Sequence, residues 1–301
     1  MSLPIVCVFA GPRSSVVLIL YHPSPTPNSP PSLPPWPRSE AGTRELSPAD
    51  VACTHHNHRR DADMATLGII GSGNIGSAVA RLAVAADINV VIANSRGPES
   101  LQDLVAELGP LAKAGTVEEA VNAGDAVVLS IPLMAVKNLP EGLLAGKLVL
   151  DTSNYYPSRD GRIQELDDST VTTSEMVRDQ LGGARYVKAF NNILAAHIPA
   201  LARPAGTDDR TALPIAGDDA AAKSEAAAII GQLGFDTVDA GTLAESWRFE
   251  PDTPAYGRIY FSDPNASDQQ LASTPPGVTP SEQVRSALDA ATRVNVAERR
   301  F

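Results

Sequence analysis

The stretch TLGIIGSGNIG at residues 66–76 decides the fold of this 301-residue chain. A short apolar run leads directly into three glycines, Gly71, Gly73 and Gly76, in the pattern G-x-G-x-x-G. Apolar residues then recur at helical spacing, and a second apolar run, Ile88–Ala93, follows. A strand, a glycine-rich turn, a helix and a second strand within about 30 residues are typical of a dinucleotide-binding unit.

Each glycine of this fingerprint has its own physical role. Gly71 permits the tight turn, Gly73 lets a pyrophosphate approach the backbone, and Gly76 lets the helix pack closely on the strand. The helix that follows presents its N-terminal N–H groups to the phosphates, where its dipole favours negative charge. We therefore expect these glycines to bind the cofactor.

The end of the second apolar run indicates which dinucleotide binds. An NAD site places an acidic side chain here, on the ribose 2′-hydroxyl. This chain has Asn94, Ser95 and Arg96 instead. A hydroxyl can donate to a 2′-phosphate and a guanidinium pairs with it as a fork, whereas a carboxylate would repel it. We expect NADP as the cofactor, in preference to NAD.

Strand-like and helical stretches alternate along the rest of the chain, which predicts an α/β fold with a doubly wound, mostly parallel sheet. After the first two strands, the expected strands are Ala126–Ser130, Lys147–Asp151, Tyr186–Phe190, Ala212–Ala216 and Phe235–Val238. The expected helices are Ser174–Leu181, Ile193–Ala202 and Ala220–Leu233. Ligands of such sheets bind beyond the carboxyl ends of the strands. Those ends supply Ser130, Ile131, Pro132, Ser153, Asn154, Ala189, Phe190, Asn191 and Asn192.

Residues 1–63 differ in composition from the rest of the chain. They hold 11 of the 25 prolines, both cysteines and four of the five histidines. Proline fixes φ and removes N–H donors, so the proline-rich stretch predicts disorder. Because Met64 stands directly before the fingerprint strand, we interpret residues 1–63 as a disordered leader or a misplaced start.

Residues 64–301 carry 19 basic and 30 acidic residues, which account for the whole net charge of −11. They hold no cysteine and one histidine, His197, which excludes a disulfide framework, a cysteine nucleophile and a usual zinc site. This acidic composition of residues 64–301 does not favour binding to nucleic acid or to an anionic membrane. No apolar run reaches the roughly 18 residues of a membrane span. We expect a soluble, cytoplasmic protein without a metal.

The sequence resembles the NADPH-dependent coenzyme F420 reductases, and also the cytosolic NADPH domain of the membrane ferric reductases. The resemblance runs from about Leu67 to Phe249. After the fingerprint, the motifs that carry it are NSR at 94–96, LSIP at 129–132, LVLDTSN at 148–154, VKAFNNI at 187–193 and AGTLAESWRFEP at 240–251. DTSN followed some 35 residues later by KAFNN is specific to this group, whereas the glycine fingerprint is shared by many dehydrogenases.

The resemblance implies a Rossmann-type domain at residues 64–155 and a small α/β extension at 156–250 that completes an acceptor cleft. The tail beyond about Tyr260 departs from the family pattern, and its residues predict a loop and an amphipathic helix at 251–301. A flat deazaflavin, coenzyme F420, or a flavin would lie there against the nicotinamide as co-substrate. The residues that the resemblance assigns to NADP are Ser72, Asn74 and Ile75 near the pyrophosphate, and Ser95 and Arg96 at the 2′-phosphate. Those that it places around the two rings are Ile131, Pro132, Asn154, Ala189 and Asn191.

Hydride transfer between two stacked rings needs near-attack geometry, about 3–3.5 Å between the carbons, and no protein acid or base at the carbon centre. Reduction of a ketone needs a proton donor. The candidate donors are Asp151, Tyr155, Tyr156 and Lys188. Asp151 is typical of a structural acceptor of loop amides, and Lys188 of a residue that extends to the surface or pairs with an acid. His197 is interpreted as a packing or capping residue.

The end of the chain predicts one more helix. Thr279–Glu282 has the pattern of a capping box with proline at the first helical position. Val284, Ala287, Leu288, Ala291 and Val294 then form a narrow apolar stripe, which packs on the same chain or on a second copy in a homodimer.

Two other functions stay open beside hydride transfer to a small-molecule acceptor. An imine or pyrroline-carboxylate reductase shares the nucleotide-binding half but continues into a large helical domain, whereas strands are expected after Asn191. An NADPH-sensing module would bind the cofactor without speeding its oxidation.

Overall fold

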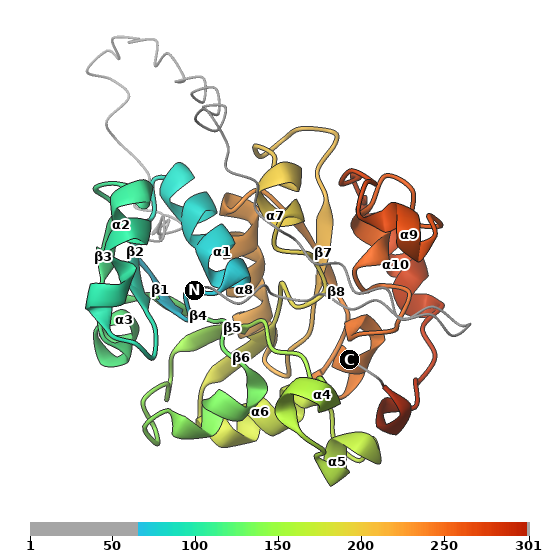
Figure 1. Ribbon diagram of the computed structural model, residues 1–301, viewed down its shortest axis with the longest axis horizontal. Helices are drawn as coiled ribbons and strands as arrows, with labels where there is room; N and C mark the ends of the chain where they lie inside the picture. Colours follow the sequence, from blue (N-terminus) through green and yellow to red (C-terminus); the bar gives the residue numbers. More distant parts are fainter. Residues whose placement is uncertain (1–65, 300–301) are drawn as a thin grey trace, which may run out of the picture. The chain divides into compact units, whose positions relative to one another are not determined.

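The computed structural model describes residues 66–299, which belong to one unit by their contacts (Figure 1). The interpretation of residues 1–63 lies outside the described residues. Within the described range, no helix is long and apolar enough to cross a membrane. The domain boundaries expected at residues 155 and 250 stay predictions.

Six parallel strands form the main sheet, in the order β3-β2-β1-β4-β5-β6. This is the strand order of the Rossmann fold, in which the order reverses between β1 and β4 and leaves a crevice beyond their carboxyl ends. The predicted doubly wound, mostly parallel sheet is therefore confirmed. The strands are β1 (Thr66–Ile70), β2 (Asn89–Ala93), β3 (Ala112–Ala114), β4 (Ala126–Leu129), β5 (Leu148–Asp151) and β6 (Arg185–Lys188).

Alternate side chains of these strands enter two apolar cores, one on each face of the sheet. In β1, Leu67 and Ile69 belong to the first core and Ile70 to the second. Residues of α1 (Asn74–Ala85) and α8 (Ala220–Gln232) complete the first core, and α6 (Thr173–Leu181) covers the second (Figure 1). Both faces are buried, which is why the strands read as continuous apolar runs.

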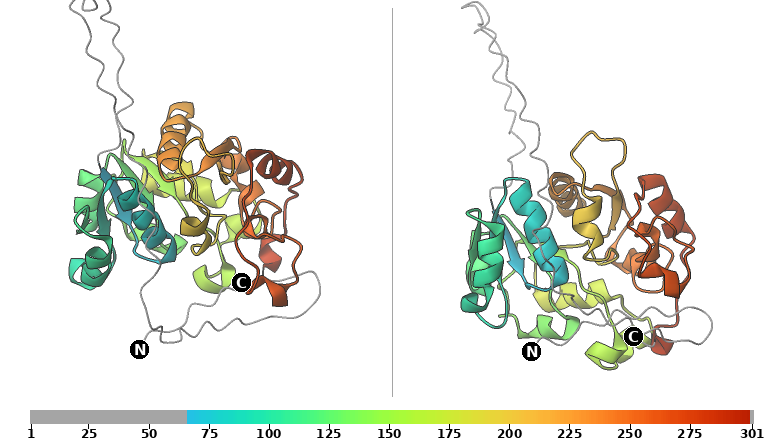
Figure 2. Two further views of the ribbon diagram at one scale, coloured as in Figure 1. Left: turned by 90° about the horizontal axis from the view of Figure 1, so that it is seen from above. Right: turned by 45° about the horizontal axis from the view of Figure 1, so that its top comes forward.

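Shorter helices fill the connections. They are α2 (Gln102–Leu108), α3 (Val117–Ala123), α4 (Pro157–Asp160), α5 (Gln164–Asp167), α7 (His197–Leu201) and α9 (Asp268–Leu271), with 3₁₀ turns η1 (Pro98–Leu101), η2 (Leu133–Asn138), η3 (Leu243–Phe249), η4 (Arg258–Tyr260) and η5 (Val296–Glu298). Figures 1 and 2 show η5, in dark red, beside α5, and the two elements are in contact.

A second sheet pairs β7 (Ala212–Ile215) with β8 (Asp236–Asp239) in parallel. It meets the main sheet at one antiparallel bridge, between Lys188 and Ala216. Helix α10 (Ser281–Asp289) packs on both strands through buried Val284 and Leu288. The apolar stripe of the last helix therefore packs on its own chain.

Three predictions about helices are wrong. Helix α7 begins at His197 rather than Ile193, because the Asn192 carbonyl accepts a hydrogen bond from Gly257 N, 2.8 Å away, instead of a helical amide. Thr279 does not cap α10, because its hydroxyl donates to the Ile259 carbonyl at 2.7 Å, and Pro280 takes the N-cap position. The apolar stripe also extends past the end of α10 at Asp289.

Candidate functional site

The fingerprint glycines divide into two that pack and one that faces open space. A Cβ at Gly71, where φ is +109°, would lie 2.1 Å from the Ser130 carbonyl oxygen, and one at Gly76 would lie 2.0 Å from the Gly71 carbonyl oxygen. A Cβ at Gly73 would meet no protein atom within 4 Å. Gly73 is also the N-cap of α1, and no described side chain caps this helix start. The geometry therefore fits a phosphate group beside Gly73.

The turn after β2 is held from within by Asn94. Its amide nitrogen donates to Ser72 Oγ and to Ser100 Oγ, each at 3.0 Å, and its oxygen accepts from Arg96 N at 2.9 Å. Ser95 and Arg96 are exposed on this turn, and Arg96 forms no ion pair with any residue of the described range. Asn94 thus joins the turn to the fingerprint loop and leaves Ser95 and Arg96 free to face a ligand.

The end of β4 lies beside the fingerprint turn. Ser130 N donates to the Ile70 carbonyl at 2.8 Å, and the close approach of Ser130 to Gly71 follows from this bond. Ile131 is half-buried and Pro132 is exposed. The structure therefore brings the end of β4, with Ser130 and Ile131, next to the fingerprint turn, and the place of Ile131 beside a ring stays a prediction.

Asn154 and Asn191 follow different strands and meet directly. Asn154 Nδ2 donates to the Asn191 carbonyl at 2.7 Å, and Asn191 Nδ2 donates to Asn154 Oδ1 at 3.1 Å and to the Phe249 carbonyl at 3.0 Å. The two asparagines therefore lie together beyond β5 and β6, and their place beside the nicotinamide stays a prediction. Asn191 Oδ1 is buried and has no hydrogen-bond partner among the described residues. This oxygen could therefore accept a hydrogen bond from a ligand.

Strained backbone brings Asn191 to this position. Phe190, directly before it, has φ of +57°, which is rare for a bulky residue and clusters at functional sites. Its fully buried ring packs edge-on against Phe235, with centroids 5.9 Å apart. Strand β6 therefore ends at Lys188, earlier than predicted. Ala189 is fully buried in the first core, and its place beside a ring stays a prediction.

Two of the candidate donors form a buried ion pair where β5 and β6 end. Lys188 Nζ lies 3.3 Å from Asp151 Oδ2 and also donates to the Ser153 carbonyl, and both charged side chains are fully buried. Asp151 accepts further hydrogen bonds from Ser153 N and Oγ at 3.2 and 2.6 Å. These extra bonds offset the desolvation of a buried pair. Asp151 and Lys188 thus act as the structural residues that the sequence favours.

Tyr186, which sequence reasoning missed, completes this pair. Its hydroxyl donates to Asp151 Oδ2 at 2.5 Å. Burial and the neighbouring carboxylate raise the pKa of Tyr186 well above its ordinary value, so it stays a donor at neutral pH. The signal was present in the sequence, because residues two apart in a strand share a face and Tyr186 stands two before Lys188.

The adjacent residues Tyr155 and Tyr156 have different partners. The Tyr155 hydroxyl donates to Asp167 at 2.9 Å, and burial raises its pKa. The Tyr156 hydroxyl lies 2.5 Å from that of Tyr256 and 3.4 Å from Asn154 Nδ2, and burial also raises its pKa. Tyr256 is a further residue that the motifs did not indicate, because it lies past their end.

His197 is a packing residue, as expected. Its ring is buried and lies edge-on to Phe261, with centroids 4.5 Å apart. Burial lowers the pKa of His197, which favours the neutral ring.

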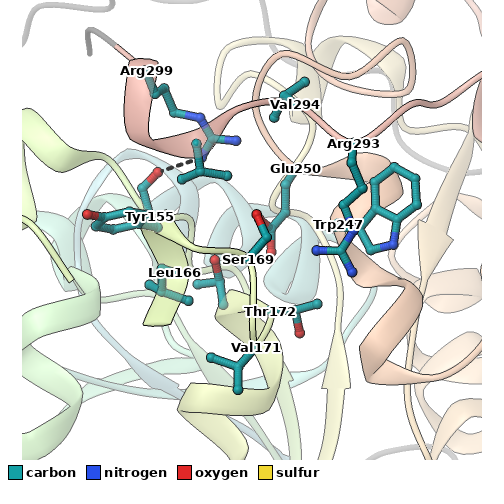
Figure 3. A pocket seen from close by; sticks show the side chains of 12 residues that line it. Tyr155, Leu166, Ser169, Val171, Thr172, Trp247, Glu250, Arg293, Val294 and Arg299 are labelled. Atoms are coloured by element: carbon teal, nitrogen blue, oxygen red, sulfur yellow. Dashed lines mark hydrogen bonds between the residues drawn. The ribbon is translucent and has the colours of Figure 1, made fainter. Parts of the chain in front are cut away.

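A small pocket is lined in part by Tyr155. Figure 3 shows its lining, which includes Thr172, Trp247, Glu250, Arg293 and Arg299. Its interior of about 20 Å³ is room for one water molecule. Glu250 is buried, and its Oε1 has no partner among the described residues.

Residues 66–155 match the model of the family described as NADP oxidoreductase coenzyme F420-dependent. Among curated relatives, the F420-dependent NADP reductase of Methanocaldococcus jannaschii is 29% identical over 209 residues, which cover 64% of this chain and 89% of that protein. The metalloreductase STEAP3 of Rattus norvegicus is 28% identical over 186 residues, which cover 61% of this chain. The chain spans only 35% of the length of that metalloreductase.

A solved structure extends the likeness. The crystal structure of a hypothetical protein from Sinorhizobium meliloti aligns with a TM-score of 0.55 and 34% identity, and the alignment covers 64% of this chain and 93% of that one. The resemblance stated from the motifs is confirmed by the family match and by these relatives.

Proposed function

We propose that this chain transfers hydride between NADPH and a deazaflavin such as coenzyme F420, or a flavin, on the basis of the match of residues 66–155 to the coenzyme F420-dependent NADP oxidoreductase family. NADPH supplies the hydride. The chain binds the two rings, orients them and excludes water, which is the whole task in such a reaction.

The observation that carries the proposal is the turn after β2. Ser95 and Arg96 are exposed there, at the strand end where an NAD enzyme has a carboxylate. Asn94 fixes this turn to Ser72 in the fingerprint loop, so the site for the 2′-phosphate and the site for the pyrophosphate keep a constant separation. Both features support NADP over NAD.

The acceptor side of the proposal is supported by the asparagine pair. Asn154 and Asn191 are more than nine-tenths buried, and they lie beyond β5 and β6, beside the Tyr156–Tyr256 contact. A flat ring with carbonyl and N–H groups along one edge offers partners to such amides. The unpartnered Asn191 Oδ1 is available for a ring N–H after a small shift.

The segment after Asn191 favours this function over an imine-type reductase. It contains β7, β8 and short helices, and α8, with 13 residues, is its longest described helix. The large helical domain of the alternative would require longer helices there.

The test is to mix the protein with NADPH and, separately, with coenzyme F420, FMN, FAD and a ferric chelate, and to follow the absorbance of the reduced nicotinamide. We expect oxidation with F420 or a flavin, and faster with NADPH than with NADH. Binding of NADPH with no acceleration by any acceptor would contradict the proposal and favour the sensing module. Oxidation only with an imine would favour the other reductase.

A further inference from the structure

Arg299, in the segment after α10, joins two loops that approach the asparagine pair. Its Nη1 donates to the Tyr155 carbonyl at 3.0 Å and its Nη2 to the Pro251 carbonyl at 2.9 Å. Its Nε donates to Asp252 Oδ2 at 3.0 Å. The Arg299 side chain is only 1% exposed, so its bonds to the two carbonyls are shielded from water, whereas the Asp252 side chain is 31% exposed. Figure 3 shows Arg299 above the pocket with its bond to Tyr155 dashed.

The asparagine pair joins the same two loops a second time. Asn154, next to Tyr155, bonds to Asn191, and Asn191 bonds to the carbonyl of Phe249, two residues before Pro251. The two connections therefore form a closed ring. Because Arg299 makes one of these two connections, the distance between the loops at the asparagine pair also depends on the arginine.

The chain conformation at the arginine is one that needs support. Asp252 has φ of +73°, a region that costs free energy for residues other than glycine. Burial raises the pKa of Asp252, whereas the Arg299 guanidinium opposes this shift by favouring the carboxylate. Loss of Arg299 would leave two buried carbonyls and this carboxylate without their donor.

We propose that Arg299 is a positioning residue for the hydride acceptor, because it fixes the two loops from which Asn154 and Asn191 are held. This inference rests on the proposed function, since it takes the asparagine pair as the acceptor contact. The planar guanidinium spans two carbonyls and a carboxylate at once, which a lysine ammonium does not do.

Arg299→Ala and Arg299→Lys test this role, with Arg210→Ala as the matched control. Arg210 is also buried, and it also bonds a carboxylate, that of Asp236, together with carbonyls, but it lies beside the β7–β8 sheet. For each variant, the Kd of NADPH, the KM of the acceptor and the single-turnover rate are measured and corrected for the folded fraction. Hydrogen exchange of residues 153–157 and 250–253 is followed in parallel, with residues 66–76 as the internal reference.

We expect Arg299→Ala to lower the single-turnover rate about 10²-fold, the loss typical of a reacting group displaced by about 1 Å. The Kd of NADPH should not change, the KM of the acceptor should rise, and exchange should quicken only in the two loops. Free guanidinium, below denaturing concentrations, should restore part of the single-turnover rate of Arg299→Ala. The rate of Arg299→Lys should lie between those of the wild-type protein and Arg299→Ala. Arg210→Ala should lower stability without changing the rate, the KM or the loops.

Equal kinetic losses in Arg299→Ala and Arg210→Ala would overturn the proposal, and so would unchanged acceptor kinetics in Arg299→Ala. If the wild-type protein reduces none of the acceptors, the proposed function fails by itself. Loop exchange then decides separately whether Arg299 positions Asn154 and Asn191, and unchanged exchange would refute that too.

Discussion

Gly73→Ala separates the binding role of the fingerprint from its packing role. An added Cβ at Gly73 meets no protein atom within 4 Å, and the φ of −72° and ψ of −172° there suit alanine. The substitution stabilises the folded protein by about 0.4–1 kcal/mol, because alanine lowers the conformational entropy of the unfolded chain. The same substitution destabilises the start of α1 by a similar free energy, because alanine is a poorer N-cap than glycine. The free energy of unfolding should therefore change by less than about 0.5 kcal/mol.

NADPH binding should respond quite differently. The methyl group occupies the space that a pyrophosphate needs, so we expect affinity to fall at least about 100-fold, or about 2.8 kcal/mol. A fluorescence titration with NADPH measures the affinity, and a circular dichroism melt measures the stability.

Gly231→Ala in α8 is the control for this experiment. It also adds a Cβ into open space, and it should stabilise the helix by about 0.5–1 kcal/mol without changing NADPH affinity. Retained NADPH affinity in Gly73→Ala would show that the fingerprint is only a turn and would refute the reasoning.

Four further substitutions test the site and the core. Arg96→Ala should weaken NADPH binding by about 1–3 kcal/mol, the range for a hydrogen bond to a charged group, and equal losses for NADH would speak against the 2′-phosphate assignment. Asn191→Leu should lower the single-turnover rate per folded molecule about 10²-fold while NADPH affinity survives, and Asn154→Leu should act alike; a normal rate would remove the pair from the site. His197 has a lowered pKa in the folded protein, so its contribution to stability is complete above its ordinary pKa near 6.5 and is lost as the pH falls below that value. Between the two pKa values the unfolding free energy should fall by up to about 1.4 kcal/mol per pH unit, and His197→Gln should flatten this slope in urea titrations; an unchanged slope would show that the ring is not the group responsible.

The fold and the cofactor crevice were predictable from the sequence because their signals are local. A buried parallel strand appears in the sequence as an apolar run. Gly71, Gly73 and Gly76 indicate the nucleotide-binding turn because residues without side chains are needed there. Parallel strands also bring their carboxyl ends to one edge, so the meeting of Asn154 and Asn191 followed from topology alone. Edge strand β3, only three residues long, lacked such a signal.

The partners of the polar side chains were decided only by the tertiary structure. Thr279 has the local pattern of a helix cap, but its hydroxyl donates to the carbonyl of Ile259, 20 residues away in the chain. Tyr256 meets Tyr156 across 100 residues, and Arg299 meets Tyr155 across 144. A hydrogen bond of this kind depends on the distance between two loops in space, and that distance is set by how both sheets and their helices pack, a quantity with no periodicity along the chain. The sequence by itself therefore determined the Rossmann sheet and the nucleotide fingerprint, whereas packing determined that Tyr256 and Arg299 contact the loop after β5.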